Sequence, residues 1–300
     1  MLFVITPNMV IDGKIDHIDI GYATFVYCSS CPNLTELPNW PNVTCVICDD
    51  CPNLTELPEW PSIKEARCSN CTGLKKLPNW HNIIGFDCNA CINLTELPEW
   101  QHVKYIICNK CPKITKLPNW PNVKTVYCSK CTGLIELPNW PIVNEVQCDG
   151  CFKLKQLPAW SIVEQVRCSD CTGLTELPDW SNVEIVNCNT CTGLTELPNW
   201  SILEVLYCDK CTSLSELPNF NKVKYVDCQN CTGLTEFPNW PMIEILFCDN
   251  CIFLEKLPNW RNVRVRYNNC PYIEYPPLSV LLQSEYLLED LKKECIIWHV

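Results

Sequence analysis

The sequence lacks any apolar run long enough to cross a bilayer. A membrane-spanning helix needs about 18 or more mostly apolar residues, and no stretch of the 300 residues reaches that length. The apolar start MLFVI is too short for the core of a signal peptide, is followed by Pro7 and has no basic flank. We therefore expect no membrane anchor and a cytoplasmic location.

Recognisable catalytic motifs are also missing. The chain has no GxGxxG, P-loop, HExxH or GxSxG pattern. Its only histidines, His17, His81, His102 and His299, are scattered without partners at a motif spacing. We expect no enzymatic activity and no cofactor.

Positive charge is scarce. Lysine and arginine total 23 against 34 aspartate and glutamate residues, which gives a net charge of -11. Nucleic-acid binding depends on neutralising phosphates with lysine and arginine, so a nucleic-acid partner is disfavoured. A protein partner with a basic or neutral surface fits this charge better.

What the sequence does contain is a repeat of constant length. The unit CPNLTELPNWPNVTCVICDD, residues 31–50, recurs along the chain every 20 residues. Its leucine recurs from Leu34 to Leu254, its proline from Pro38 to Pro258, and its tryptophan from Trp40 to Trp260 with Phe220 as the one substitute. A fixed period of this size is typical of a solenoid, in which each repeat packs only on its neighbours.

Alternation inside the unit predicts a short strand followed by an extended return. Val43, Val46 and Cys48 would point into the core, while Cys45 and Ile47 would point outward. The proline after the second leucine stops a helix and lacks the donor that a central strand needs. The tryptophan that follows is expected to fill the convex side of the core.

Written from its strand, the unit reads VxxVxCxxCxxLxxLPxWP and resembles the leucine-rich repeat, LxxLxLxxN/CxxL, over roughly residues 23–277. Its LTELPxWP run is similar to the short LPxLP repeats of bacterial effectors, and the cysteine-rich array resembles repeat proteins of giant viruses. The resemblance implies a curved right-handed superhelix with a parallel concave sheet of short strands and an extended or turn-like convex side. It also implies protein binding, in a host cytosol if the chain comes from a virus or a secreted effector. In each pair the first cysteine stands where that family has leucine.

Both ends differ from the array of about 13 repeats in residues 23–277. Residues 1–22 are expected to form a β cap, with a hairpin turn at Asp12-Gly13. The last repeat, after Val263, is one residue shorter than its predecessors. Leucines at helical spacing predict a helical cap over residues 278–300, with a helix for docking a partner as the alternative.

The CxxC pairs allow three interpretations. Two successive pairs, such as Cys128, Cys131, Cys148 and Cys151, have a spacing that is read as a zinc site. The same spacing follows from a 20-residue solenoid whose buried positions are filled by small apolar thiols. Stacked coils would also bring like cysteines into disulfide range. We expect reduced packing thiols and no metal, and keep a zinc or iron–sulfur protein and a disulfide ladder as alternatives.

The residues that would point outward from the strands vary from repeat to repeat. Tyrosine and arginine are enriched at the centres of protein interfaces, so the sequence predicts a concave binding face. Its candidate residues are Tyr27, Arg67, Tyr105, Tyr127, Arg167, Tyr207, Tyr225, Phe247 and Tyr267. The function expected is a non-enzymatic interaction scaffold, with a multi-site metalloprotein or a structural component of a larger assembly as alternatives. The sequence gives no indication of the oligomeric state.

Overall fold

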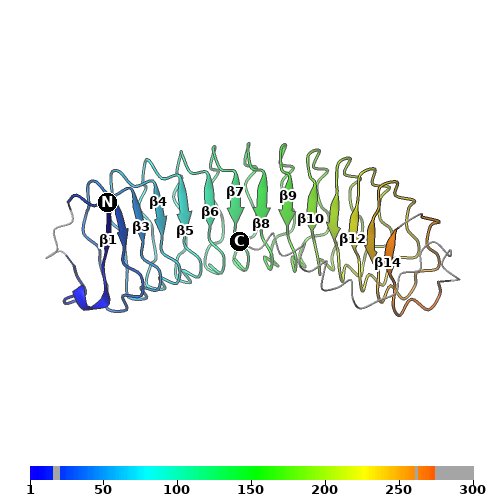
Figure 1. The fold of residues 1–300 in the computed structure, drawn as a ribbon, viewed down its shortest axis with the longest axis horizontal. Helices are drawn as coiled ribbons and strands as arrows, with labels where there is room; N and C mark the ends of the chain where they lie inside the picture. The colour runs from blue at the N-terminus through cyan, green and yellow to red at the C-terminus, as the bar shows by residue number, and fades with distance from the viewer. Residues whose placement is uncertain (16–20, 261–262, 274–300) are drawn as a thin grey trace.

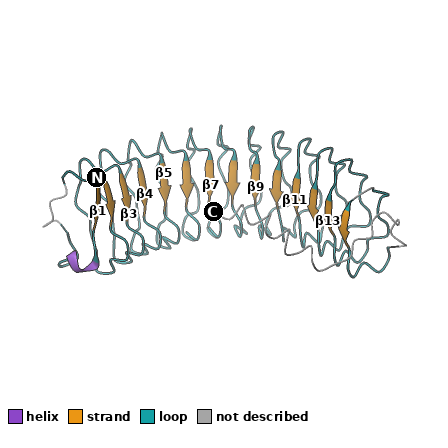
Figure 2. Cartoon of the chain, viewed as in Figure 1, coloured by secondary structure: helices purple, strands orange, loops and turns teal. Residues whose placement is uncertain are grey.

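The computed structural model describes residues 1–15, 21–260 and 263–273. In this part of the chain, each coil contributes one three-residue strand to a single parallel sheet, and every strand pairs with the next along the sequence. Figure 1 shows the strands side by side along an arched rod, and Figure 2 shows that loops make up the rest of each coil. The strands are β1 (Leu2–Val4), β2 (Phe25–Tyr27), β3 (Cys45–Ile47), β4 (Glu65–Arg67), β5 (Gly85–Asp87), β6 (Tyr105–Ile107), β7 (Thr125–Tyr127), β8 (Glu145–Gln147), β9 (Gln165–Arg167), β10 (Ile185–Asn187), β11 (Val205–Tyr207), β12 (Tyr225–Asp227), β13 (Ile245–Phe247) and β14 (Arg264–Arg266).

The register of the sheet follows the sequence period. Cys45 pairs with Glu65, and Glu65 with Gly85, so that equivalent residues of successive repeats stand side by side. The step shortens only at the end, where Ile245 pairs with Arg264. The predicted leucine-rich-repeat solenoid of about 13 turns is therefore confirmed, together with its shorter last repeat.

Each strand ends in a turn that uses a left-handed residue two places after the first cysteine. At Asp50, φ is 55°, and the amide of this residue donates to the carbonyl of Ser69 in the next coil at 2.8 Å. Asparagine and aspartate tolerate this conformation better than other residues with a side chain. Thr190, with φ of 61°, is β-branched and therefore strained there.

The tryptophans and Phe220 form a buried column along one side of the rod. Neighbouring rings stack with centroids 5.8 to 6.3 Å apart from Trp40 to Trp100 and again from Trp120 to Trp260. The indole Nε1 of Trp60 donates to the carbonyl of Pro38 in the preceding coil at 3.0 Å, and this bond recurs along the column. The ring spacing exceeds the usual strand spacing of about 4.8 Å. The coils are therefore wider on the tryptophan side, which agrees with the arched shape of the rod (Figure 1).

The N-terminal end differs from the predicted hairpin in its strand pairing. The Asp12-Gly13 turn is present, with φ of 50° and 82°, but among residues 1–15 only one antiparallel bridge, Ile11 with Lys14, flanks it. Strand β1 instead pairs in parallel with β2 and so extends the main sheet, and a single helical turn, η1 (Pro7–Met9), follows β1. The C-terminal helix predicted over residues 278–300 lies outside the described residues.

Candidate binding surface

The open face of the sheet is formed by two rows of side chains, one from the first residue of each strand and one from the third. The middle residue of each strand from β2 to β14 is buried, whereas most residues of these two rows are half-buried or exposed. Eight of the nine residues predicted for the binding face lie in these rows: Tyr27, Arg67, Tyr105, Tyr127, Arg167, Tyr207, Tyr225 and Phe247. The sheet therefore presents the predicted residues together on one surface.

Tyr267 is the residue that the structure places elsewhere. Because the last repeat is shorter, Arg266 pairs with Phe247 and takes the outward position. Tyr267 follows at the place of the first cysteine and packs, partly buried, against the core. This is a correction to the predicted face: Arg266 replaces Tyr267 in the outward row.

Near the N-terminal end, the side chains of the open face bind one another across several coils. The Arg67 guanidinium lies 2.7 Å from a carboxylate oxygen of Asp49 and 3.7 Å from one of Asp87. The Tyr105 hydroxyl donates to Glu65, two coils away, at 2.8 Å. Gly85 stands between them, and a Cβ there would lie 1.8 Å from the Tyr105 ring. The absent side chain thus makes room for the tyrosine to cross a whole repeat.

Two tyrosines of this surface have altered acidity. Burial, followed by the hydrogen bond to Glu65, raises the pKa of Tyr105 to about 12. Burial and a hydrogen bond to Glu145, 2.7 Å from the hydroxyl, raise the pKa of Tyr127 to about 12 as well. Both phenols therefore stay protonated and fixed as donors at neutral pH, which makes them rigid, amphipathic contact groups rather than bases.

Towards the C-terminal end, the open face carries an aromatic cluster. The rings of Tyr207 and Tyr225 are 5.1 Å apart, and Tyr225 meets Phe247 edge-on at 5.8 Å. The Arg266 guanidinium lies over the Phe247 ring, 4.7 Å from its centroid, and also pairs with Asp249. This part of the face thus already holds a cation against an aromatic ring and a carboxylate.

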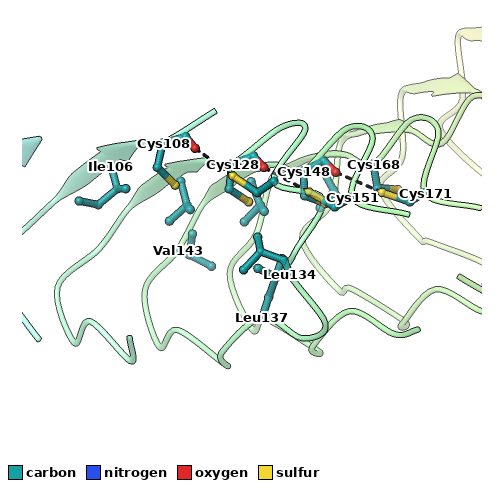
Figure 3. Packing of buried hydrophobic residues seen from close by; sticks show 14 of the residues in the cluster. Ile106, Cys108, Cys128, Leu134, Leu137, Val143, Cys148, Cys151, Cys168 and Cys171 are labelled. Atoms are coloured by element: carbon teal, nitrogen blue, oxygen red, sulfur yellow. Dashed lines mark hydrogen bonds between the residues drawn. The ribbon is translucent and has the colours of Figure 1, made fainter. Parts of the chain in front are cut away.

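The cysteine columns lie on the buried side of the sheet. The thiol of each second cysteine donates to the carbonyl of the first cysteine in the preceding coil, at 2.9 to 3.2 Å, as Figure 3 shows for Cys151 and Cys128. Burial raises the pKa of first cysteines such as Cys68, Cys88 and Cys228. The described cysteines are free thiols, and among the described residues no group of three or more His, Cys, Asp or Glu side chains is arranged to hold a metal ion. As hydrogen-bond donors in an apolar core, these thiols act as packing groups that also satisfy a carbonyl.

A polar row directly after the first cysteines was not identified from the sequence. The amide of Ser129 donates to Oδ1 of Asn109 at 2.7 Å, and the amide of Asn109 donates in turn to Asn89 at 3.0 Å. The same bond links Ser169 to Asp149. The sequence did contain a pattern that could have predicted this row, because the position holds only Ser, Asp, Asn or Gln from Ser29 to Asp249. The row fastens each coil to the next beside the open face.

A charged row immediately before the strands was also missed. The row begins with the basic residues Lys64, Lys104 and Lys124. Further along it carries the acidic residues Glu164, Glu184, Glu204 and Glu244, with Lys224 between the last two. We call this set the rim row. Lys224 pairs with Glu204 at 2.9 Å. Apart from Lys224, the two signs thus occupy different halves of the rod.

Comparison with known proteins finds leucine-rich repeat proteins among the similar solved structures. No protein-family model matches the sequence, and comparison with curated proteins finds no significant match. Among solved structures, a leucine-rich repeat protein from Bacteroides ovatus is similar, with a TM-score of 0.47, 15% identity, and coverage of 84% of this chain and 77% of that one. The leucine-rich repeat domain of the type III effector XopL has a TM-score of 0.38 and 17% identity, covering 77% and 75% of the two chains. A leucine-rich cell surface protein from Faecalibacterium prausnitzii has a TM-score of 0.36 and 15% identity, covering 89% and 81%.

No helix within the described part of the chain is long and apolar enough to span a membrane. The described residues thus form a solenoid of cysteine-rich 20-residue repeats, the fold class predicted from the repeat pattern.

Proposed function

We propose that the protein is a non-enzymatic scaffold that binds a partner protein on the open face of its sheet. One observation carries this proposal: the buried rows repeat the same residue types in almost every coil, whereas the two open-face rows change from coil to coil. A surface that served only the fold would have no need for this variety. Tyrosine, arginine and phenylalanine are residues that dominate binding energy when an interface buries them.

The partner that fits this face best has a basic or neutral surface. The chain carries a net charge of -11. On the aromatic cluster, the contact of Arg266 with Phe247 and Asp249 shows the kind of cation that the face accommodates. Electrostatic attraction would raise the association rate of such a partner more than its affinity. A cytoplasmic location, or a host cytosol for a viral or secreted protein, agrees with the many reduced thiols.

The absence of catalysis is part of the same proposal. His81 and His102 are exposed and lie outside the open-face rows. The titratable groups of the face, such as Tyr105 with Glu65, are paired with one another and held as donor and acceptor. Such pairs give a surface for recognition and provide no activated nucleophile beside a general base.

The experiment compares the partners captured by two triple variants in extracts of the source cells. In the first, Tyr127→Ala, Arg167→Ala and Tyr207→Ala remove side chains from the open face. In the matched control, Glu136→Ala, Glu176→Ala and Glu216→Ala change exposed residues of the same repeats outside that face. Circular dichroism establishes that both variants keep the fold.

The proposal predicts a protein that the wild type and the control capture and the open-face variant loses. A partner bound equally well by all three would show that the interaction uses another surface. In that case the open face would belong to the fold alone.

A further inference from the structure

The rim row is an ordered ladder of backbone hydrogen bonds. The amide of Asn144 donates to the carbonyl of Lys124 at 2.9 Å, and the amide of Glu164 donates to Asn144 at 2.8 Å. The same bond joins Lys124 to Lys104 at 2.7 Å and Glu184 to Glu164 at 2.8 Å. Successive residues of the row therefore stand one strand spacing apart, about 4.8 Å, in a fixed order along the rod.

The distribution of charge along this ladder does not help the coils to stack. Lys104 lies next to Lys124, and Glu164 lies next to Glu184, so that like charges are neighbours and repel one another. Within the described residues, none of these four side chains forms an ion pair. The four residues are exposed. Their arrangement is thus available for contacts outside the chain.

The order of charges has the symmetry of a two-fold contact. Counting outward from Asn144, the first neighbours are Lys124 and Glu164, and the second neighbours are Lys104 and Glu184. The first and second neighbours thus carry opposite charges on the two sides, whereas the third neighbours are Ile84 and Glu204 and the fourth are Lys64 and Lys224. In a two-fold dimer, residue i of one copy meets residue j of the other and the reverse also holds. An antiparallel second copy centred on Asn144 would place all four charges opposite their complements.

The shape of the rod brings this segment into position. The strands begin towards the outer rim of the arch, and β6 to β10 lie around its crest (Figure 1). Two convex rims can approach each other only near their crests, where the four charged residues are. Ile142 and Ile162 replace the asparagine that many repeats have two places before the rim row, and Ile162 is 43% exposed. The crest therefore combines an apolar centre with complementary charges on either side.

We propose that the chain forms an antiparallel dimer through its crest, with Lys104 and Lys124 of each copy paired with Glu184 and Glu164 of the other. The contact is small and wet, so it is a reversible, concentration-dependent dimer. It uses the rim row and leaves the open face exposed, and it does not depend on the function proposed above. The dimer would present two open faces to a partner.

Charge reversal tests the pairing directly. Lys104→Glu with Lys124→Glu gives an all-acidic crest, and Glu164→Lys with Glu184→Lys gives an all-basic one. Each variant alone should dissociate, because all four ion pairs of the two-fold dimer become repulsive. If each exposed pair is worth up to about a factor of five, the dimer constant weakens by up to about six hundredfold. An equimolar mixture of the two should associate again, because every acidic crest then meets a basic one. Lys64→Glu with Lys222→Glu is the matched control, since it makes the same change in net charge away from the crest.

Sedimentation equilibrium over a range of concentrations, in about 0.1 M salt, gives the masses. At this salt, repulsion between the two net negative chains is screened beyond about 10 Å. The apparent masses of the wild type and of the control should rise with concentration from 34.5 kDa towards twice that mass. A wild type that stays at 34.5 kDa up to millimolar concentration would overturn the proposal. A dimer that survives either reversal, or a mixture that fails to associate, would overturn it too.

Discussion

The tryptophan column allows a sharp test of how the coils are held together. Trp140 is fully buried, stacks on Trp120 and Trp160 with centroids 6.1 and 6.0 Å away, and donates from Nε1 to Pro118 at 3.0 Å. Trp140→Ala removes both stacking contacts and leaves a cavity between two coils. Large-to-small changes of this kind cost about 3–5 kcal/mol.

A natural phenylalanine in the same column provides the matched comparison. Phe220 stacks on Trp200 and Trp240 with centroids 6.1 and 6.3 Å away, but has no ring donor for Pro198. Trp140→Phe should therefore cost about 1–3 kcal/mol, from one hydrogen bond and a smaller ring. Phe220→Trp should add the missing bond and stabilise the chain by about 0.5–1.5 kcal/mol.

Urea unfolding followed by far-UV circular dichroism measures these differences, and hydrogen exchange in β7 and β8 tests whether the damage from Trp140→Ala is local. The expected order of stability is Phe220→Trp, wild type, Trp140→Phe and Trp140→Ala. A free energy of unfolding for Trp140→Ala within about 0.5 kcal/mol of the wild-type value is typical of a surface substitution. That result would show that the tryptophan column does not hold the coils together.

Further predictions concern pH and two backbone positions. Because burial raises the pKa of the first cysteines above the ordinary 9.0, unfolding releases protons at alkaline pH, so stability is full below about pH 9 and falls above it. Above pH 9 the free energy of unfolding should fall by about 1.4 kcal/mol per thiol for each pH unit, and the urea midpoint should fall with it. A midpoint unchanged between pH 8 and 10 would contradict protonated, buried thiols. Gly85→Ala should displace the Tyr105 ring from Glu65 and lower the pKa of Tyr105 from about 12 towards 10, as seen by ultraviolet titration. Thr190→Asn should raise stability by about 1 kcal/mol, since asparagine accepts the left-handed conformation, while Asn230→Thr should lower it; equal melting temperatures would refute the strain at this turn.

The sequence was sufficient to predict the main architecture, because each coil can bury its apolar residues only against an identical neighbour. A constant period then fixes the register, and the leucine, cysteine and tryptophan positions lie in the core as expected. The short last repeat was also visible as a change of period. The right-handed sense of the superhelix and the cap over residues 278–300 stay predictions.

Contacts that cross from one repeat to another were harder to predict. Strand β1 pairs with β2 across 23 residues, which a reading of residues 1–22 alone as a hairpin overlooked. The position of Tyr105 above Gly85 depends on a side chain that spans two coils. Tyr267 was assigned to the wrong row because the deletion shifts the strand by one residue, and a shift by one exchanges the two faces.

The binding face itself stays a proposal, although its geometry is now specific. The sequence identified the outward residues but not which of them bind each other, such as Tyr127 with Glu145. The rim row was overlooked because its residues precede the strands and follow no alternation. Its pattern becomes visible only when the coils are stacked in register.

The central claim is that the cysteine columns belong to the apolar core and leave the open face as the functional surface. Intact mass spectrometry of freshly purified protein, under native and under denaturing non-reducing conditions, tests this claim most directly. The account predicts one chain mass of 34.5 kDa with every thiol reduced, or its dimer under native conditions, and no component lost on denaturation. Metal released on denaturation, or a deficit of about 2 Da for each disulfide, would contradict it and make the cysteine columns the functional centre.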